Sequence, residues 1–208
     1  MPAETKIKKK IFVRILAPKM FQEQLIGETP VIEARMLLGR KMTVNMMSLT
    51  NDPRDQNTQI KLDITTLKGA DAVGTEVLGC TLLPAFVRRL VRKEKRRVDD
   101  CFTVKTSDNK TVIIKPFLLT INIVTNSILT SLRKKARDLV KNEALTLGYE
   151  ALMTEILSHK LQDKIRKELN KVYPLKQCEI RDFQLFVETK KRAEEPEKEV
   201  VANAEASN

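Results

Sequence analysis

The amino-acid sequence predicts an α+β fold built on an antiparallel sheet. Apolar and polar residues alternate through much of residues 10–124, which is typical of half-buried strands. From 125 to 173 the apolar residues instead recur every three or four positions, as in helices, and residues 175–187 return to a strand pattern. Because strands and helices occupy separate stretches, the order favours α+β over an alternating parallel α/β sheet.

The first strands follow from the period of two. Lys10–Ala17 is expected to be a strand that ends at Pro18. Leu38–Met46 and Ile60–Thr65 both alternate, and the polar residues Thr50–Thr58 lie between them. Two alternating segments on either side of a short polar loop predict an antiparallel pair.

A hairpin is expected in the middle of the chain. Lys68–Gly79 holds three of the six glycines and is interpreted as an exposed connection. Val98–Thr106 and Thr111–Ile123 then form the hairpin, because the Asp-Asn pair between them tolerates the positive φ of tight turns. Pro116 indicates an edge position or a bulge in the second strand, since proline has no N–H to donate.

The helical part begins near Asn126, which is available as an N-cap. Further helices are expected over Tyr149–Leu157 and Lys160–Val172, and Pro174 ends the last one. The expected domain organisation is a basic N-terminal arm at 1–9, one folded domain at 10–187 with its β-rich core at 10–124, helical part at 125–173 and closing strand at 175–187, and a tail at 188–208. The tail carries six Glu against four Lys or Arg and no aromatic residue, which predicts a disordered acidic segment.

The charge of the chain indicates a polyanionic partner. Its 38 Lys and Arg exceed its 27 Asp and Glu by 11, which suits nucleic acid or an anionic membrane surface. Seven of the ten residues Arg88–Arg97 are basic, and a helix over Leu82–Arg97 would carry them on one half and apolar residues on the other. Such a stripe can meet RNA phosphates, although a solvated helix face is the alternative. With no Trp and 4% aromatic residues, phosphate and sugar contacts to structured RNA fit better than a membrane interface or base stacking.

No motif makes a positive case for catalysis. His159 is the single histidine, and the three cysteines form no C-x-x-C pair, so a zinc site is not expected. The glycines form no phosphate-binding loop. We therefore expect no enzyme, no cofactor, no metal and no small-molecule substrate, with a Cys–His nucleophilic pair as the open alternative. No apolar stretch approaches the ~20 residues that a membrane-spanning helix needs.

Several segments, in order from about Lys9 to Val187, resemble one family. They are Ile15-Leu16-Ala17-Pro18-Lys19-Met20-Phe21, Ile26-Gly27-Glu28-Thr29-Pro30, Leu38-Gly39-Arg40, Arg97-Val98-Asp99-Asp100 and Val172-Tyr173-Pro174-Leu175 followed by Glu179-Ile180-Arg181. Together they resemble the S-three-A-e family of small-subunit ribosomal proteins, which archaea and eukaryotes share. Without the long eukaryotic extensions, the chain looks like the shorter archaeal form.

The resemblance implies a barrel-like antiparallel sheet with peripheral helices. It also implies a structural constituent of the small ribosomal subunit, bound to its rRNA on the platform near the mRNA exit and supporting translation initiation in the cytoplasm. Expected partners are small-subunit rRNA including its 3′ region, neighbouring platform proteins and nearby mRNA. A non-ribosomal RNA-binding assembly or initiation factor is the alternative function.

The candidate RNA-binding residues are concentrated at Lys6–Arg14, Arg88–Arg97 and Arg133–Lys141, with Lys19 and Arg40 in addition. The lysines of the N-terminal arm either reach into RNA or remain solvated. The candidates are Lys8, Lys9, Lys10, Arg14, Lys19, Arg40, Arg88, Arg89, Arg92, Lys93, Lys95, Arg96, Arg97, Arg133, Lys134, Lys135 and Arg137.

Overall fold

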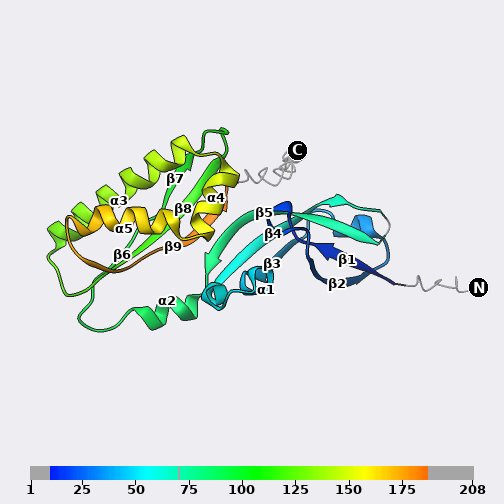
Figure 1. Ribbon diagram of the computed structural model, residues 1–208, viewed down its shortest axis with the longest axis horizontal. Helices are drawn as coiled ribbons and strands as arrows, with labels where there is room; N and C mark the ends of the chain where they lie inside the picture. Colours follow the sequence, from blue (N-terminus) through cyan, green and yellow to red (C-terminus); the bar gives the residue numbers. More distant parts are fainter. Residues whose placement is uncertain (1–9, 70, 187–208) are drawn as a thin grey trace, which may run out of the picture.

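The computed structural model describes residues 10–69 and 71–186. It contains one nine-stranded sheet that runs through two lobes of an elongated molecule (Figure 1). The two lobes are joined where β5 (Ala72–Leu82) pairs with β9 (Leu175–Leu185). The expected arm at 1–9 and acidic tail at 188–208 lie outside the described residues.

The N-terminal lobe is the strand part of the chain up to β5. Its strands lie in the order β2-β1-β5-β4-β3, antiparallel except for a short parallel pairing between β1 and β5. Its elements are β1 (Ile11–Leu16), η1 (Lys19–Phe21), β2 (Leu25–Val31), η2 (Ala34–Leu37), β3 (Lys41–Asn45), α1 (Met47–Thr50), η3 (Pro53–Asn57), β4 (Thr58–Leu67) and β5. The expected first strand and the expected antiparallel pair of β3 with β4 are confirmed.

The C-terminal lobe combines the rest of the sheet with the longer helices. Its elements are α2 (Pro84–Leu90), β6 (Arg97–Asp99), β7 (Phe102–Lys105), β8 (Thr111–Thr120), α3 (Asn126–Thr146), α4 (Tyr149–Leu157), α5 (Lys160–Asn170) and β9. β8 pairs with β9 on one side and with β6 and β7 on the other, all antiparallel. The hairpin is confirmed between β7 and β8, with Asn109 at φ 57° in its turn, but its first strand, expected over Val98–Thr106, is divided into β6 and β7. Pro116 lies at a register shift within this interior strand, so the bulge is confirmed and the edge position is wrong.

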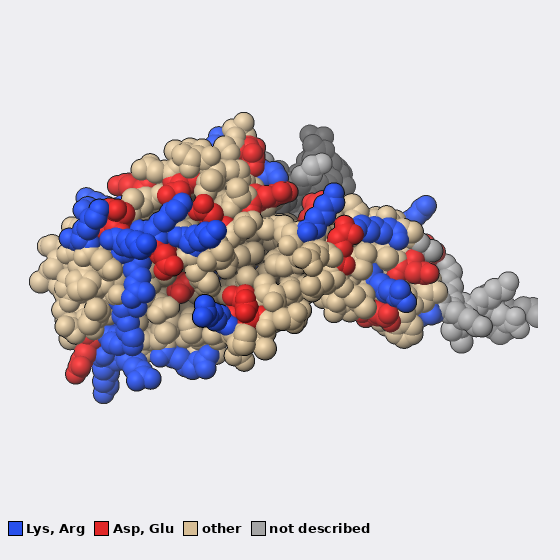
Figure 2. All heavy atoms as spheres, viewed as in Figure 1, with Lys and Arg blue, Asp and Glu red and all other residues tan. Residues whose placement is uncertain are grey.

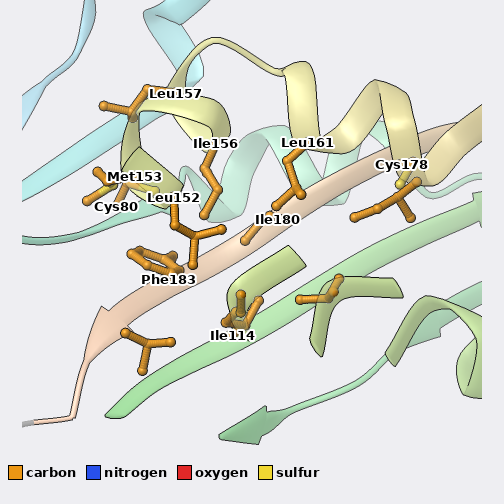
Figure 3. Packing of buried hydrophobic residues seen from close by; sticks show 14 of the residues in the cluster. Cys80, Ile114, Leu152, Met153, Ile156, Leu157, Leu161, Cys178, Ile180 and Phe183 are labelled. Carbon is orange, nitrogen blue, oxygen red and sulfur yellow. The ribbon is translucent and has the colours of Figure 1, made fainter. Parts of the chain in front are cut away.

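Successive residues of β8 serve two separate packing surfaces. Leu118 belongs to the main apolar core, which α3, α4 and α5 cover. Phe117 and Leu119 point the other way and pack with Val87 of α2. Figure 3 shows the main core, where side chains from α4 and α5 such as Ile156 meet Ile180 of β9. Full burial of one such aliphatic side chain stabilises the fold by about 1.5–3 kcal/mol.

β5 corrects one expectation from the sequence. The glycine-rich residues Lys68–Gly79 are not an exposed connection, because β5 begins at Ala72 and pairs with β1, β4 and β9. A Cβ on Gly79 would collide with the carbonyl oxygen of Phe183. The glycine is therefore needed where two backbones approach closely, not where the chain turns.

The sheet remains open. Among the described residues, β2 pairs only with β1 and β3 pairs only with β4, so the pairings do not close a barrel. The α+β class with a mostly antiparallel sheet agrees with the prediction, whereas the barrel-like closure is not seen. The N-cap of α3 is Thr125, not Asn126 as expected, and its side chain makes no capping hydrogen bond.

Candidate nucleic-acid interface

The cationic stripe is divided between a short helix and a loop. α2 ends at Leu90, Val91 has an extended backbone (φ −77°, ψ 116°), and Glu94 lies in the left-handed region at φ 69°. The helix predicted over Leu82–Arg97 is therefore confirmed only at Pro84–Leu90, because Leu82 still belongs to β5 and the chain leaves the helix after Leu90. Two causes act together: like charges three or four positions apart destabilise a helix, and the apolar residues that anchor α2 to the sheet end at Val91.

The loop at 91–96 is anchored beside the start of β9. The backbone N–H of Arg96 donates to Thr120 Oγ1 at 2.9 Å, and the N–H of Thr120 donates to the Arg96 carbonyl oxygen at 3.0 Å. Thr120 is in turn the register partner of Leu175 across β8 and β9. This pairing places the loop next to Lys176, which is exposed to solvent.

Three cations of this region form what we call the cationic cluster: Arg92, Lys95 and Lys176. The side chain of Lys176 approaches that of Lys95 and, with smaller contributions from burial and from the charge of Arg92, lowers the pKa of Lys95. None of the ion pairs among the described residues involves a member of the cluster. Cations held together without an acidic partner repel one another, and an external anion would relieve that repulsion.

The cluster lies within a longer basic surface. Figure 2 shows Lys and Arg side chains running as a band from α5, past the start of β9, to the loop after α2. Arg166 of α5 lies on this route, where its guanidinium approaches the carbonyl oxygen of Leu175 at 3.5 Å. We define the basic band as Arg88, Arg89, Arg92, Lys93, Lys95, Arg96, Arg166 and Lys176. Arg166 and Lys176 were not among the sequence candidates, although the regular basic positions of the amphipathic α5 gave a signal for Arg166.

Other sequence candidates make contacts within the protein. Arg137 forms a bidentate pair with Asp100 at 2.8–3.0 Å, which ties α3 to the segment between β6 and β7. Arg97 pairs with Asp99 in the same strand. Arg14 lies 3.5 Å from Glu28. Because carboxylates already balance these three charges, their electrostatic attraction for a phosphate is weaker.

The remaining candidates are distributed over the molecule. Arg133, Lys134 and Lys135 are exposed on α3, whereas Lys10, Lys19 and Arg40 are exposed in the other lobe. Lys8 and Lys9 lie outside the described residues. The structure thus joins the candidates at Arg88–Arg96 to two residues from distant parts of the sequence, Arg166 and Lys176.

Two of the three cysteines are buried in the core. Burial raises the pKa of the Cys80 and Cys178 thiols to about 12, which keeps them protonated at neutral pH. His159 faces Glu179, with Nδ1 3.5 Å from the carboxylate. Residues 10–69 and 71–186 contain no group of three or more residues placed to hold a metal ion. No described helix is both long and apolar enough to cross a membrane.

Comparison with known proteins agrees with the resemblance seen in the sequence. Residues 3–188 match the family model described as the Ribosomal S3Ae family. A protein of Methanothrix thermoacetophila named small ribosomal subunit protein eS1 is 30% identical over 86% of this chain and 84% of its own length. Proteins of the same name from Nanoarchaeum equitans (29% identical, 86% and 89% covered) and Methanothermobacter thermautotrophicus (30%, 83% and 88%) are similar. This chain therefore belongs to the ribosomal S3Ae family, as an archaeal-type member.

Proposed function

We propose that this chain is a structural constituent of the small ribosomal subunit and binds small-subunit rRNA through the basic band. The observation that carries the proposal is the cationic cluster, none of whose three charges takes part in an ion pair among the described residues. Family membership and the names of the archaeal relatives support the ribosomal assignment. The function involves no turnover, so the protein is not an enzyme.

The mechanism we propose is phosphate neutralisation by a preformed surface. RNA phosphates that approach the band displace condensed counterions, which contributes a favourable, salt-dependent term to binding. Because Arg96 is anchored to β8 and Lys176 belongs to β9, the cations are held on a sheet with a fixed shape. Contacts of this kind set the position of RNA helices without reading their sequence.

We extend the proposal to the place of the protein in the subunit. The family resemblance supports a platform position near the mRNA exit and the 3′ region of the rRNA, in the cytoplasm, with a role in translation initiation. Exposed apolar side chains on the N-terminal lobe, such as Phe12 (65% exposed) and Leu25 (56%), support contact with neighbouring platform proteins. Val31 of β2 and Met42 of β3 share one apolar cluster, which supports a barrel-like arrangement of that lobe.

Neutralising the cationic cluster tests the proposal. The triple variant Arg92→Gln, Lys95→Gln, Lys176→Gln should bind small-subunit rRNA about 100-fold more weakly than the natural chain at low salt, because a phosphate that meets no cation releases no counterion. The slope of log affinity against log salt should become shallower by about 0.7–0.9 for each phosphate that is no longer neutralised. Filter binding or fluorescence anisotropy at four salt concentrations measures both quantities.

A matched control carries the same change in charge elsewhere. Arg35→Gln, Lys41→Gln, Lys105→Gln removes three exposed cations outside the band and should change the affinity by less than about fivefold. Equal reductions of affinity in the two triple variants would overturn the band as the binding surface. Sedimentation of the natural chain with small subunits through a high-salt sucrose gradient separates a constituent, retained at one copy per subunit, from a transient factor.

A further inference from the structure

Phe86 is an aromatic residue without a packing role in the core. It lies half-buried on α2, yet none of the three buried apolar clusters in the described structure includes it or packs against it. The guanidinium of Arg89 lies over its ring, 5.9 Å from the centroid. Arg89 also donates to Asn57 Oδ1 at 3.1 Å, which holds the pair against η3. The chain therefore keeps a partly exposed aromatic ring at a defined place.

A groove of about 330 Å³ lies beside this ring. Its walls come from α2, η3, α5 and β9, so it opens where the two lobes meet. Arg54 and Arg166 line it, and Arg166 belongs to the basic band. A volume of this size is at the small end of sites for organic ligands, which span about 300–1,000 Å³.

The lining has the chemistry that single-stranded nucleotides require. Phe86 offers a ring on which a base can stack, and such stacking accepts every base because each has a π-face. The amides of Asn57 and Gln177 and the carboxylate of Asp163 supply hydrogen-bonding groups of the kind that contact base edges. Asn57 already accepts from Arg89 and Gln177 already donates to Glu179, but a heteroaromatic base can pair with the second polar atom of each amide, which an apolar ligand cannot.

We propose that the groove takes the base of one unpaired rRNA nucleotide, which stacks on Phe86 while its flanking phosphates lie on the basic band. The inference rests on the proposed function, since the band must hold the RNA backbone for a base to enter. It adds an element of recognition that phosphate contacts lack, because only an unpaired nucleotide can turn its base into the groove. The low aromatic content is consistent with a single stacking position and not with a row of them.

Replacing the ring without unfolding the helix tests the inference. Phe86→Leu keeps an apolar side chain on α2 and should weaken rRNA binding by about tenfold while leaving the salt slope unchanged, because stacking involves no counterions. Phe86→Tyr should restore the affinity. The control Phe12→Leu changes an equally non-core ring in the other lobe and should leave the affinity within about twofold of the natural chain.

A second measurement locates the base directly. Ultraviolet cross-linking of the natural chain to rRNA, followed by mass spectrometry, should attach a single nucleotide to the peptide that contains Phe86. If Phe86→Leu binds rRNA as the natural chain does and the peptide carries no nucleotide, the groove is not a base site. The proposal that the basic band binds rRNA phosphates would be unaffected by that result. If the natural chain itself does not bind rRNA, the proposed function fails and this inference fails with it.

Discussion

The two lobes differ in charge far more than in size. Residues 10–82 contain 9 Lys or Arg and 8 Asp or Glu, whereas residues 83–186 contain 22 and 12. The described chain therefore carries almost all of its net positive charge in the C-terminal lobe. Nine of its thirteen exposed large apolar side chains lie instead in the N-terminal lobe. The difference indicates two kinds of partner: an anionic one for the C-terminal lobe and an apolar one for the N-terminal lobe.

The pairing of charges sets the cationic cluster apart from several other cations of the chain. In the N-terminal lobe, Lys68 pairs with Glu23 and lowers the pKa of that carboxyl, and Arg14 pairs with Glu28. In the C-terminal lobe, Arg97 and Arg137 are also paired with carboxylates, whereas the cationic cluster has no such partner among the described residues. A protein that needed only solubility would gain nothing from holding like charges together. The contrast indicates that the C-terminal lobe is shaped for an external anion.

The largest effect on stability is expected from a substitution at Gly79, where β5 pairs with β9 and joins the two lobes. Gly79→Ala places a Cβ against the carbonyl oxygen of Phe183, a backbone atom that cannot turn away. The free energy of unfolding should fall by about 3 kcal/mol, the upper part of the range for overpacking. Urea unfolding followed by circular dichroism measures the change.

Gly27→Ala is the matched control, since a Cβ there meets nothing within 4 Å. Alanine at this strand position should leave the stability unchanged or raise it by up to about 0.5 kcal/mol. If both variants lose the same stability, glycine is needed in these strands for its backbone freedom. The close approach of β5 to β9 would then not be the reason for glycine at position 79.

The apolar surface of the N-terminal lobe should matter for assembly and not for RNA affinity. Phe12→Ser with Leu25→Ser removes two exposed side chains from adjacent strands, so the stability of the free protein should change by less than about 0.5 kcal/mol. Incorporation into small subunits, measured by competition with the natural chain, should fall by about tenfold. A loss of rRNA affinity of the same size would mean that the N-terminal lobe also faces RNA. The assignment of different partners to the two lobes would then be wrong.

The sequence predicts the fold well where a local pattern is compatible with only one kind of structure. The alternation in β3 and β4 and the helical spacing in α3 to α5 reflect burial on one face, which the sequence shows directly. Gly79 has two possible meanings, a turn or a close backbone approach, and only the pairing with β9 decides between them. β5 was missed for this reason.

The sequence predicts only those residues of the candidate site that are close together in the chain. The density of charge between Arg88 and Arg97 is visible in the sequence, although the helix expected there is not formed beyond Leu90. Lys176 is about 80 positions from Lys95, and no period connects the two residues. Their proximity depends on the order of β6, β8 and β9 in the sheet, which is a property of the topology.

The smallest expected effect on stability comes from His159, which lies where the two lobes meet. His159 is surrounded by acids from both lobes: Glu179 of β9, Asp163 of α5 and Asp55 of η3. Its hydrogen bond to Glu179 is the main cause that raises the pKa of the histidine in the folded protein, and burial opposes it. Because the folded pKa lies above the unfolded value, the stabilisation is complete below about pH 6.5 and is lost as the pH rises through the folded pKa.

His159→Asn should therefore cost more stability at pH 5.5 than at pH 8.5. Asparagine is the suitable replacement, because it tolerates the left-handed backbone of this position (φ 58°). The side chain is 41% exposed and its pair with Glu179 is screened by solvent, so the difference should stay below about 1 kcal/mol. Urea unfolding of both proteins at the two pH values measures it. An equal loss at both values would show that the imidazole acts at the junction through packing alone, and a larger loss at pH 8.5 would contradict the pairing with Glu179.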